Sequence, residues 1–262
     1  RAPTVQPPED VDLIELAAAA EPSESIEDLV ARKDLIRLVE RAMALVPAYT
    51  DALNNRGNAL LTLRRNGEAA EDFERVLAID PDYPYARGKL LHARLRCCDW
   101  TGYDRQAAQI AVYIANGKRS SMPFENIAVS GSPRDQLECA RLWINDKCPP
   151  SATPLWSGQR YRHDRIRLAY LSADFHEHAT AYLVAGLFEQ HDRNRFETIA
   201  VSFGPDSESE IRTRLKNSLD RFIDVRTESD FETATRLRDM EVDIAVDLKG
   251  LTGNSRPAIL AL

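Results

Sequence analysis

The stretch that decides the fold is Ile166–Thr180, IRLAYLSADFHEHAT. Its first seven residues mix apolar and β-prone side chains as a buried or half-buried strand does, and the strand pattern stops at Ala173-Asp174. An apolar run, AYLVAGLFEQ, then predicts a helix for which Thr180 is the expected N-cap. Two histidines and two acids lie between the strand and the helix. Because ligands of open α/β sheets bind beyond the carboxyl ends of the strands, we look for chemistry here.

Three further apolar runs predict strands at 196–203, 221–225 and 242–248. They alternate with helical patterns at 180–191, 207–218 and 229–240, which is typical of a parallel, doubly wound sheet. If the strand order is the common 3-2-1-4, the topological switch point lies between the first and fourth strands. The loops 174–180 and 249–254 are then expected to share one crevice.

A repeat signal precedes this region. The segment Thr50–Pro81 predicts two helices, with Gly57 on the first and with Ala69 and Phe73 on the second. Pro81 closes a 34-residue period that begins at Pro47, so the segment resembles a tetratricopeptide repeat. Such a helix pair cannot bury its apolar face alone, and helical patterns at 11–46 and 85–116 are the expected neighbours.

The expected domain order follows from these patterns. Residues 1–10 are proline-rich and polar and are expected to be a disordered terminus. Residues 11–117 form the tetratricopeptide-like repeats, and residues 118–160 a connecting loop, a helix from Pro133 to about Asp146, and a proline-rich linker. Residues 161–262 form a Rossmann-like lobe. The fold class is α + α/β.

Composition excludes several classes of protein. The chain has 262 residues, of which 44% are hydrophobic and 29% charged, and a formal net charge of −7 argues against a basic, nucleic-acid-binding surface. No apolar run approaches the roughly 18 residues of a membrane span. The chain begins with Arg1 and has no signal pattern, which suggests an excerpt or processed form of a cytoplasmic protein. Its four cysteines lack zinc-type spacing and are expected to be reduced thiols.

The first predicted strand is not followed by the GxGxxG phosphate-binding fingerprint of dinucleotide enzymes. The segment that contains SADFHEHAT, followed by VDIAVDLKGLTGN and preceded by helical repeats, instead resembles the amino-terminal lobe of the protein O-GlcNAc transferase catalytic region. That resemblance covers roughly residues 165–262. It implies one half of a two-lobed (GT-B), inverting, metal-independent glycosyltransferase. It also implies UDP-GlcNAc as the donor substrate, held mainly by a second lobe, and no cofactor.

The resemblance also implies site residues. The family's proposed general base falls on His178, where Ala179 replaces a proline, and Thr180 matches the family's threonine. A histidine also suits the chemistry, because it titrates near neutral pH and can take a hydroxyl proton. The family's asparagine before G-x-T is Lys249 here, a replacement that alters a position expected to contact sugar or acceptor. The remaining expected substrate-binding residues are Asp174, Gly250 and Thr252.

Two other expectations concern the loop histidines. His176 is expected to face solvent, and a zinc pair of His176 with His178 is not expected, because no third ligand is spaced nearby. Asp174 is interpreted as a turn or capping residue that could also orient a histidine.

The leading hypothesis is transfer of N-acetylglucosamine to Ser or Thr of a protein or peptide acceptor that the helical repeats present. One alternative is a related transferase with a fucosyl or glucosyl donor, since this lobe does not define the base or sugar. Another is a non-catalytic, repeat-based protein-binding module. Nucleic acid is not an expected partner.

Overall fold

The computed structural model describes residues 33, 34, 36, 37 and 49–262. Its packing divides into two compact units, one ending at Leu142 and the other beginning at Trp143. The predicted terminus 1–10 and nearly all of the predicted helical segment 11–46 lie outside the described residues. Helix α8 (Pro133–Lys147) contains the division, a little before the predicted linker.

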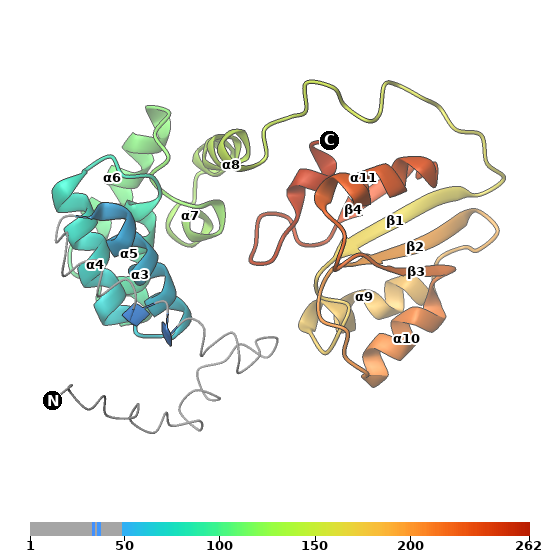
Figure 1. Cartoon of the computed structure of the whole chain (residues 1–262), viewed down its shortest axis with the longest axis horizontal. Coiled ribbons are helices and arrows are strands. Elements are labelled where there is room, and N and C mark those ends of the chain that lie inside the picture. The colour runs from blue at the N-terminus through green and yellow to red at the C-terminus, as the bar shows by residue number, and fades with distance from the viewer. Residues whose placement is uncertain (1–32, 35, 38–48) are drawn as a thin grey trace, which may run out of the picture. The chain divides into compact units, whose positions relative to one another are not determined.

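The predicted repeat is a pair of packed helices, α3 (Thr50–Thr62) and α4 (Asn66–Ile79) (Figure 1). A β-carbon placed on Gly57 would lie 2.8 Å from the ring of Phe73, so a larger residue has no room between the two helices. Five apolar residues of these helices are fully buried, among them the predicted Ala69 and Phe73: Leu53, Leu60, Ala69, Phe73 and Val76. The helix-packing interpretation of this segment is therefore confirmed.

A second helix pair follows, α5 (Ala86–Arg96) and α6 (Tyr103–Ala115), where a neighbour was predicted. The loop expected after Gly117 is wrong in part, because it contains the short helix α7 (Pro123–Val129). Pro123 suits the first helical position, where no intrahelical N–H bond is needed, and the carboxylate of Glu125 accepts a bond from the N–H of Met122. Helix α8 begins as predicted.

The second unit is built on four parallel strands in the order β3-β2-β1-β4. This is the common order that the switch-point argument assumed, and the predicted strands are all present. Their bounds are β1 (Ile166–Ser172), β2 (Phe196–Ser202), β3 (Arg221–Asp224) and β4 (Ile244–Asp247). The chain reverses its direction of strand addition between β1 and β4, so their carboxyl ends flank the switch point.

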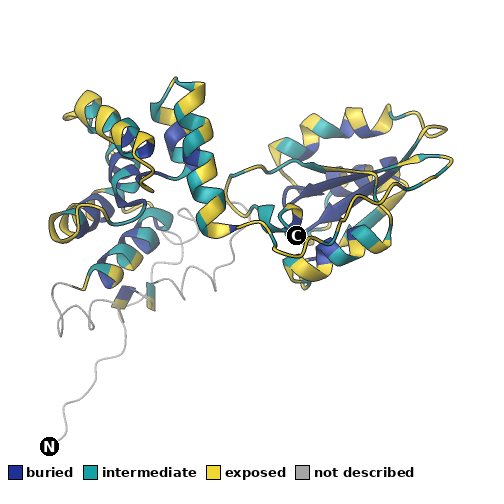
Figure 2. Cartoon of the chain, turned by 90° about the horizontal axis from the view of Figure 1, so that it is seen from above, coloured by how far each residue is buried: buried dark blue, intermediate teal, exposed yellow. Residues whose placement is uncertain are grey.

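Helices cover both faces of this sheet (Figure 1). Helices α9 (Ala179–Glu189) and α10 (Glu210–Ser218) lie on one face, and α11 (Asp230–Asp239) and the short 3-10 helix η1 (Pro257–Leu260) on the other. Figure 2 shows the central strands buried between helices whose outer sides are exposed. Alternate residues of β1 point to opposite faces and so divide between two cores.

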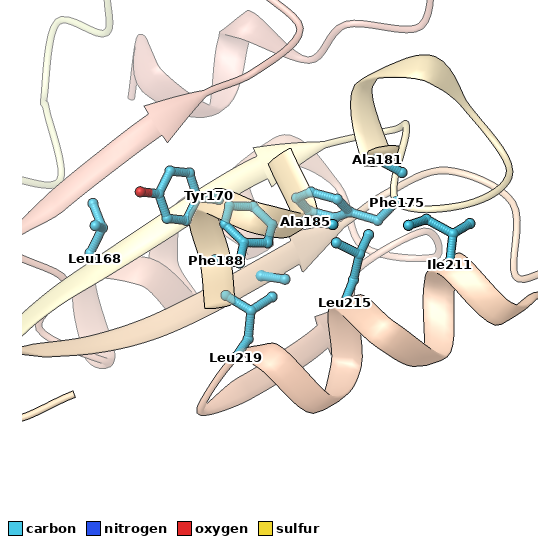
Figure 3. Close-up of a cluster of buried hydrophobic side chains, with 10 residues drawn as sticks. Leu168, Tyr170, Phe175, Ala181, Ala185, Phe188, Ile211, Leu215 and Leu219 are labelled. Carbon is cyan, nitrogen blue, oxygen red and sulfur yellow. The ribbon is translucent and has the colours of Figure 1, made fainter. Parts of the chain in front are cut away.

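The core under α9 and α10 reaches the site region, because Phe175 belongs to it (Figure 3). Phe175 is fully buried and its ring lies edge-on to those of Phe188 and Phe222. The loop after β1 is therefore anchored by an aromatic side chain, and the polar residues on either side of it are held near the sheet. Among the described residues, no helix is long and apolar enough to cross a membrane.

Candidate active site

The candidate site lies at the carboxyl ends of β1 and β4. Asp174 follows β1, Lys249 follows β4, and the two residues are 75 positions apart in the sequence. The Nζ atom of Lys249 lies 3.0 Å from both carboxylate oxygens of Asp174. The two side chains are only 10% and 9% exposed, so the pair is largely withdrawn from water. The two loops that were expected to share a crevice are thus joined by a buried ion pair.

Asp174 is the centre of a wider polar cluster. Its backbone N–H donates to the buried hydroxyl of Ser172, which ends β1. Its Oδ2 atom accepts a bond from the hydroxyl of Thr180 at 3.4 Å and lies 3.7 Å from Nδ1 of His178. The structure therefore brings four of the predicted site residues, Asp174, His178, Thr180 and Lys249, into one constellation.

His178, and not Thr180, caps helix α9. The Nδ1 atom of His178 accepts a hydrogen bond of 3.1 Å from the backbone N–H of Thr180, and the backbone of His178 is extended. The expected Thr180 N-cap is wrong because the helix begins at Ala179, two residues earlier than expected, and the ring nitrogen satisfies one of its unpaired N–H groups. The side chain of His178 is 42% exposed, so the imidazole is partly open to solvent.

His176 is buried, which corrects the expectation that it faces solvent. It is 8% exposed, and its ring centroid lies 5.7 Å from that of His178. Burial lowers the pKa of His176, and the neighbouring His178 lowers it further. Of the two loop histidines, the more accessible is therefore His178.

The loop after β4 supplies the two other predicted residues. Gly250 adopts a left-handed backbone conformation with φ of 55°, which explains a glycine at this turn. The hydroxyl of Thr252 donates a bond of 2.8 Å to the carbonyl of Lys249 and closes the turn. Both residues are exposed, and no described contact joins them to His178.

Arg212 on α10 contacts both the loop after β1 and the loop after β2. It was not predicted from the sequence. It is 3% exposed, and its Nη1 atom donates a bond of 2.8 Å to the carbonyl of Phe175. Its Nη2 atom lies 2.9 Å from a carboxylate oxygen of Asp206, in the loop after β2. The signal was present in the sequence, because Arg212 lies beside Ile211 and three residues before Leu215 on the apolar face of a predicted helix.

This arrangement holds the groups that a proton-transfer site needs. It presents an accessible imidazole at a helix N-terminus, beside a carboxylate that is neutralised by an ammonium group. The Gly250 turn brings backbone to the same edge of the sheet. Such a cluster suits proton exchange with a group that is bound at the strand ends.

Two segments of the chain match models of known protein families. Residues 152–262 match the model described as glycosyl transferase family 41, and residues 50–83 match the tetratricopeptide repeat model. The class is a glycosyltransferase lobe preceded by a helical repeat. Residues 152–262 are thus similar to glycosyl transferase family 41, and the predicted resemblance to O-GlcNAc transferases is confirmed.

Curated relatives point to the same family. The chain is 25% identical over 190 residues to a probable UDP-N-acetylglucosamine–peptide N-acetylglucosaminyltransferase of Arabidopsis thaliana, a match that covers 66% of this chain and 19% of the relative. It is 25% identical over 180 residues to the UDP-N-acetylglucosamine–peptide N-acetylglucosaminyltransferase of Caenorhabditis elegans. That match covers 63% of this chain and 16% of the relative. The chain thus spans less than a fifth of the length of either relative.

A solved structure has the same fold. A mutant O-GlcNAc transferase of Thermobaculum terrenum aligns with a TM-score of 0.57 at 22% identity, covering 95% of this chain and 49% of that chain. At this identity the likeness concerns the fold alone. It supports the succession of a helical repeat unit and a parallel four-stranded lobe.

Proposed function

We propose that the protein transfers N-acetylglucosamine from UDP-GlcNAc to serine or threonine hydroxyls of protein acceptors, with inversion at the sugar and without a metal ion. The observation that carries this proposal is the position of His178 at the switch point of a family 41 lobe. The curated relatives are named as peptide N-acetylglucosaminyltransferases, which supports the acceptor and sugar class. The two alternative donors, fucosyl and glucosyl nucleotides, are separated by experiment below.

His178 is proposed as the general base. The acceptor oxygen attacks the anomeric carbon, its proton passes to Nε2 of His178, and the bond from that carbon to UDP breaks with its electron pair leaving on UDP. Nε2 is the nitrogen to assign, because Nδ1 faces the N-terminus of helix α9, and Nε2 must be unprotonated when it takes the proton. A histidine suits this step since its charge changes near neutral pH.

The other predicted residues are proposed to bind substrate. Asp174 and Thr180 hold the loop that carries His178. Gly250 allows close approach of backbone to a sugar, and the exposed hydroxyl oxygen of Thr252 can accept a further hydrogen bond. Lys249 is proposed to act here through Asp174, since its ammonium group is directed at that carboxylate.

The partners are proposed from the same comparisons. The tetratricopeptide unit is proposed to present the protein or peptide acceptor, as helical repeats bind partners along their extended surfaces. The donor nucleotide is proposed to be held mainly by a second lobe outside these 262 residues. A cytoplasmic location is part of the proposal, and all four cysteines are free thiols.

The test of the base is His178→Ala in the enzyme that contains this chain, assayed with labelled UDP-GlcNAc and a peptide acceptor. We expect turnover to fall by about 10²- to 10⁴-fold while UDP affinity stays nearly unchanged, because a base acts in the transition state. His163→Ala is the matched control, since it removes a histidine of the same unit that bonds the carbonyl of Glu241. Normal turnover in folded His178→Ala protein would show that another group is the base.

Three experiments separate the alternatives: UDP binding, transfer from different donors, and peptide binding. Calorimetry on residues 1–262 is expected to show weak or undetectable UDP binding, and tight binding would contradict a separate donor lobe. Transfer from a fucosyl or glucosyl nucleotide, with none from UDP-GlcNAc, would assign the alternative donor. Peptide binding by the repeats without transfer from any of these donors would support the protein-binding module.

A further inference from the structure

The hydrogen bonds around His178 define which ring nitrogen carries its proton. The backbone N–H of Thr180 has a fixed proton, so the Nδ1 atom that it contacts at 3.1 Å must be an unprotonated acceptor. A neutral His178 in this structure therefore carries its proton on Nε2. In that tautomer Nε2 is a donor, and it cannot take a proton from an acceptor hydroxyl.

The base form needs the opposite tautomer, with the proton on Nδ1 and a free lone pair on Nε2. A proton on Nδ1 requires an acceptor in place of the N–H of Thr180. The nearest carboxylate oxygen is Oδ2 of Asp174, which lies 3.7 Å away and beyond hydrogen-bond distance. Asp174 is therefore the group that could stabilise the base form, provided that its carboxylate turns toward the ring.

Lys249 opposes this rotation of the Asp174 carboxylate toward His178. Its ammonium group lies 3.0 Å from both oxygens of Asp174, and both side chains are nearly buried. A carboxylate held by a close cation in a poorly solvated place is strongly fixed, because the attraction grows as water is excluded. Lys249 also stands where the resembling family has an asparagine, which carries no charge.

The remaining charged and titratable groups near His178 do not compete for Nδ1. The carboxylate of Glu177 accepts a bond from the hydroxyl of Tyr182. His176 faces His178 ring to ring at 5.7 Å, and Arg212 is directed at the carbonyl of Phe175. Among the described contacts of the ring, the choice of tautomer is thus between the N–H of Thr180 and the carboxylate of Asp174.

We propose that Lys249 is a positioning residue for His178: by holding the carboxylate of Asp174 it keeps His178 in the Nε2–H form that caps helix α9. The base form arises when Asp174 turns from Lys249 to His178. Solvent then removes the proton from Nε2 and returns one to Nδ1, and the accessible ring allows this exchange. The assignment of a base to His178 rests on the proposed function, whereas the tautomer does not.

The test is nitrogen-15 NMR of the histidine ring in the 262-residue chain, at a pH where His178 is neutral and without donor or acceptor. His178→Gln identifies its signals among the five histidines. In the wild type we expect Nδ1 to resonate in the unprotonated range. In Lys249→Met, Nδ1 is expected to move to the protonated range and Nε2 to the unprotonated range, because Asp174 is released to accept from the ring.

Three further variants complete the test. Lys249→Arg keeps a cation on Asp174 and is expected to retain the wild-type tautomer. The double variant Asp174→Ala, Lys249→Met has no carboxylate and is also expected to show the Nε2–H form. Lys249→Gln is read in the same way as Lys249→Met and replaces it if that variant does not fold.

The proposal is overturned if folded Lys249→Met or Lys249→Gln keeps the Nε2–H form, or if the double variant shows the Nδ1–H form. A merely structural lysine would change the stability of the chain but not the tautomer. Because no transfer is measured, these results are independent of the turnover of His178→Ala. An inactive His178→Ala with an unchanged tautomer in Lys249→Met would retain the base and reject Lys249 as its positioning residue.

Discussion

Gly204 lies so close to Ala173 that a β-carbon on Gly204 would be 1.6 Å from the carbonyl oxygen of Ala173. The two residues leave the carboxyl ends of the neighbouring strands β2 and β1. Their backbones therefore touch at the edge of the sheet where His178 and Asp174 lie. A glycine is needed here for close approach of two backbones, and not for an unusual φ.

Replacing this glycine should damage the second unit. For Gly204→Ala we expect a loss of about 3 kcal/mol in the free energy of unfolding, because the contact is with backbone that cannot rotate away. Gly186→Ala is the matched control, since its β-carbon would meet nothing within 4 Å on helix α9. The free energy of unfolding of that control should stay unchanged or rise by up to about 1 kcal/mol. Equal urea midpoints for the two variants would contradict the close approach.

The repeat unit offers a similar pair of glycines. Gly57→Leu should lower the free energy of unfolding by about 1 to 3 kcal/mol, because the added side chain would enter the space of the Phe73 ring and force α3 and α4 apart. Gly67→Leu makes the same substitution where nothing lies within 4 Å. Thermal unfolding should show a lower midpoint for Gly57→Leu than for Gly67→Leu. An unchanged midpoint in Gly57→Leu would refute its packing role.

Glu125 should make the repeat unit less stable as the pH rises. Burial raises the pKa of Glu125 to about 7, although its bond from the N–H of Met122 acts in the opposite direction. A raised carboxyl pKa means that the folded state holds the proton more tightly. Stability is therefore highest below the unfolded pKa of about 4.3 and falls until the pH passes about 7.

Glu125→Gln should remove this pH dependence. The amide oxygen of glutamine can still accept from the N–H of Met122 but carries no charge. We expect the variant to match the wild type near pH 4 and to exceed its free energy of unfolding at pH 8 by about 3 kcal/mol. Urea unfolding at the two pH values measures this. Parallel pH profiles for both proteins would show that Glu125 is ionised in the fold without cost.

His176 should destabilise the second unit in mild acid. Burial is the main cause of its lowered pKa, so the unfolded chain binds a proton that the folded chain resists. The stability contribution is complete above the unfolded pKa of about 6.5 and is lost as the pH falls through that value. His176→Gln should flatten the profile between pH 7 and about 5, and an NMR titration of the ring gives the pKa directly. A profile as steep as that of the wild type would place the acid sensitivity elsewhere.

Local periodicity was sufficient to predict the elements of this chain. The strand 166–172 was predicted with the bounds that β1 has, because a buried parallel strand needs a continuous apolar run. The parallel, doubly wound sheet was predicted as well, and the structure has the common strand order 3-2-1-4 that the switch-point argument assumed. The packing role of Gly57 was also predicted from the sequence, because a glycine at this position is part of the tetratricopeptide repeat pattern.

Contacts between loops that are distant in the sequence could not be predicted from local periodicity. The sequence placed Lys249 at a family position without showing that its ammonium group would pair with Asp174, 75 residues away. It predicted Thr180 as the cap of α9 and an exposed His176, whereas the fold uses His178 as the cap and buries His176. Those outcomes depend on where Arg212 and Phe175 hold the loop after β1.

The amino-acid sequence was therefore sufficient to show which segments are helices and strands, in what order they occur, and which family they resemble. Those properties arise from the spacing of apolar and small residues along the chain, which each segment carries within itself. The tertiary structure alone decided the electrostatics of the candidate site. The ion pair of Lys249 with Asp174 and the proton position on His178 depend on distances between loops, and these exist only after the sheet has brought the ends of β1 and β4 together.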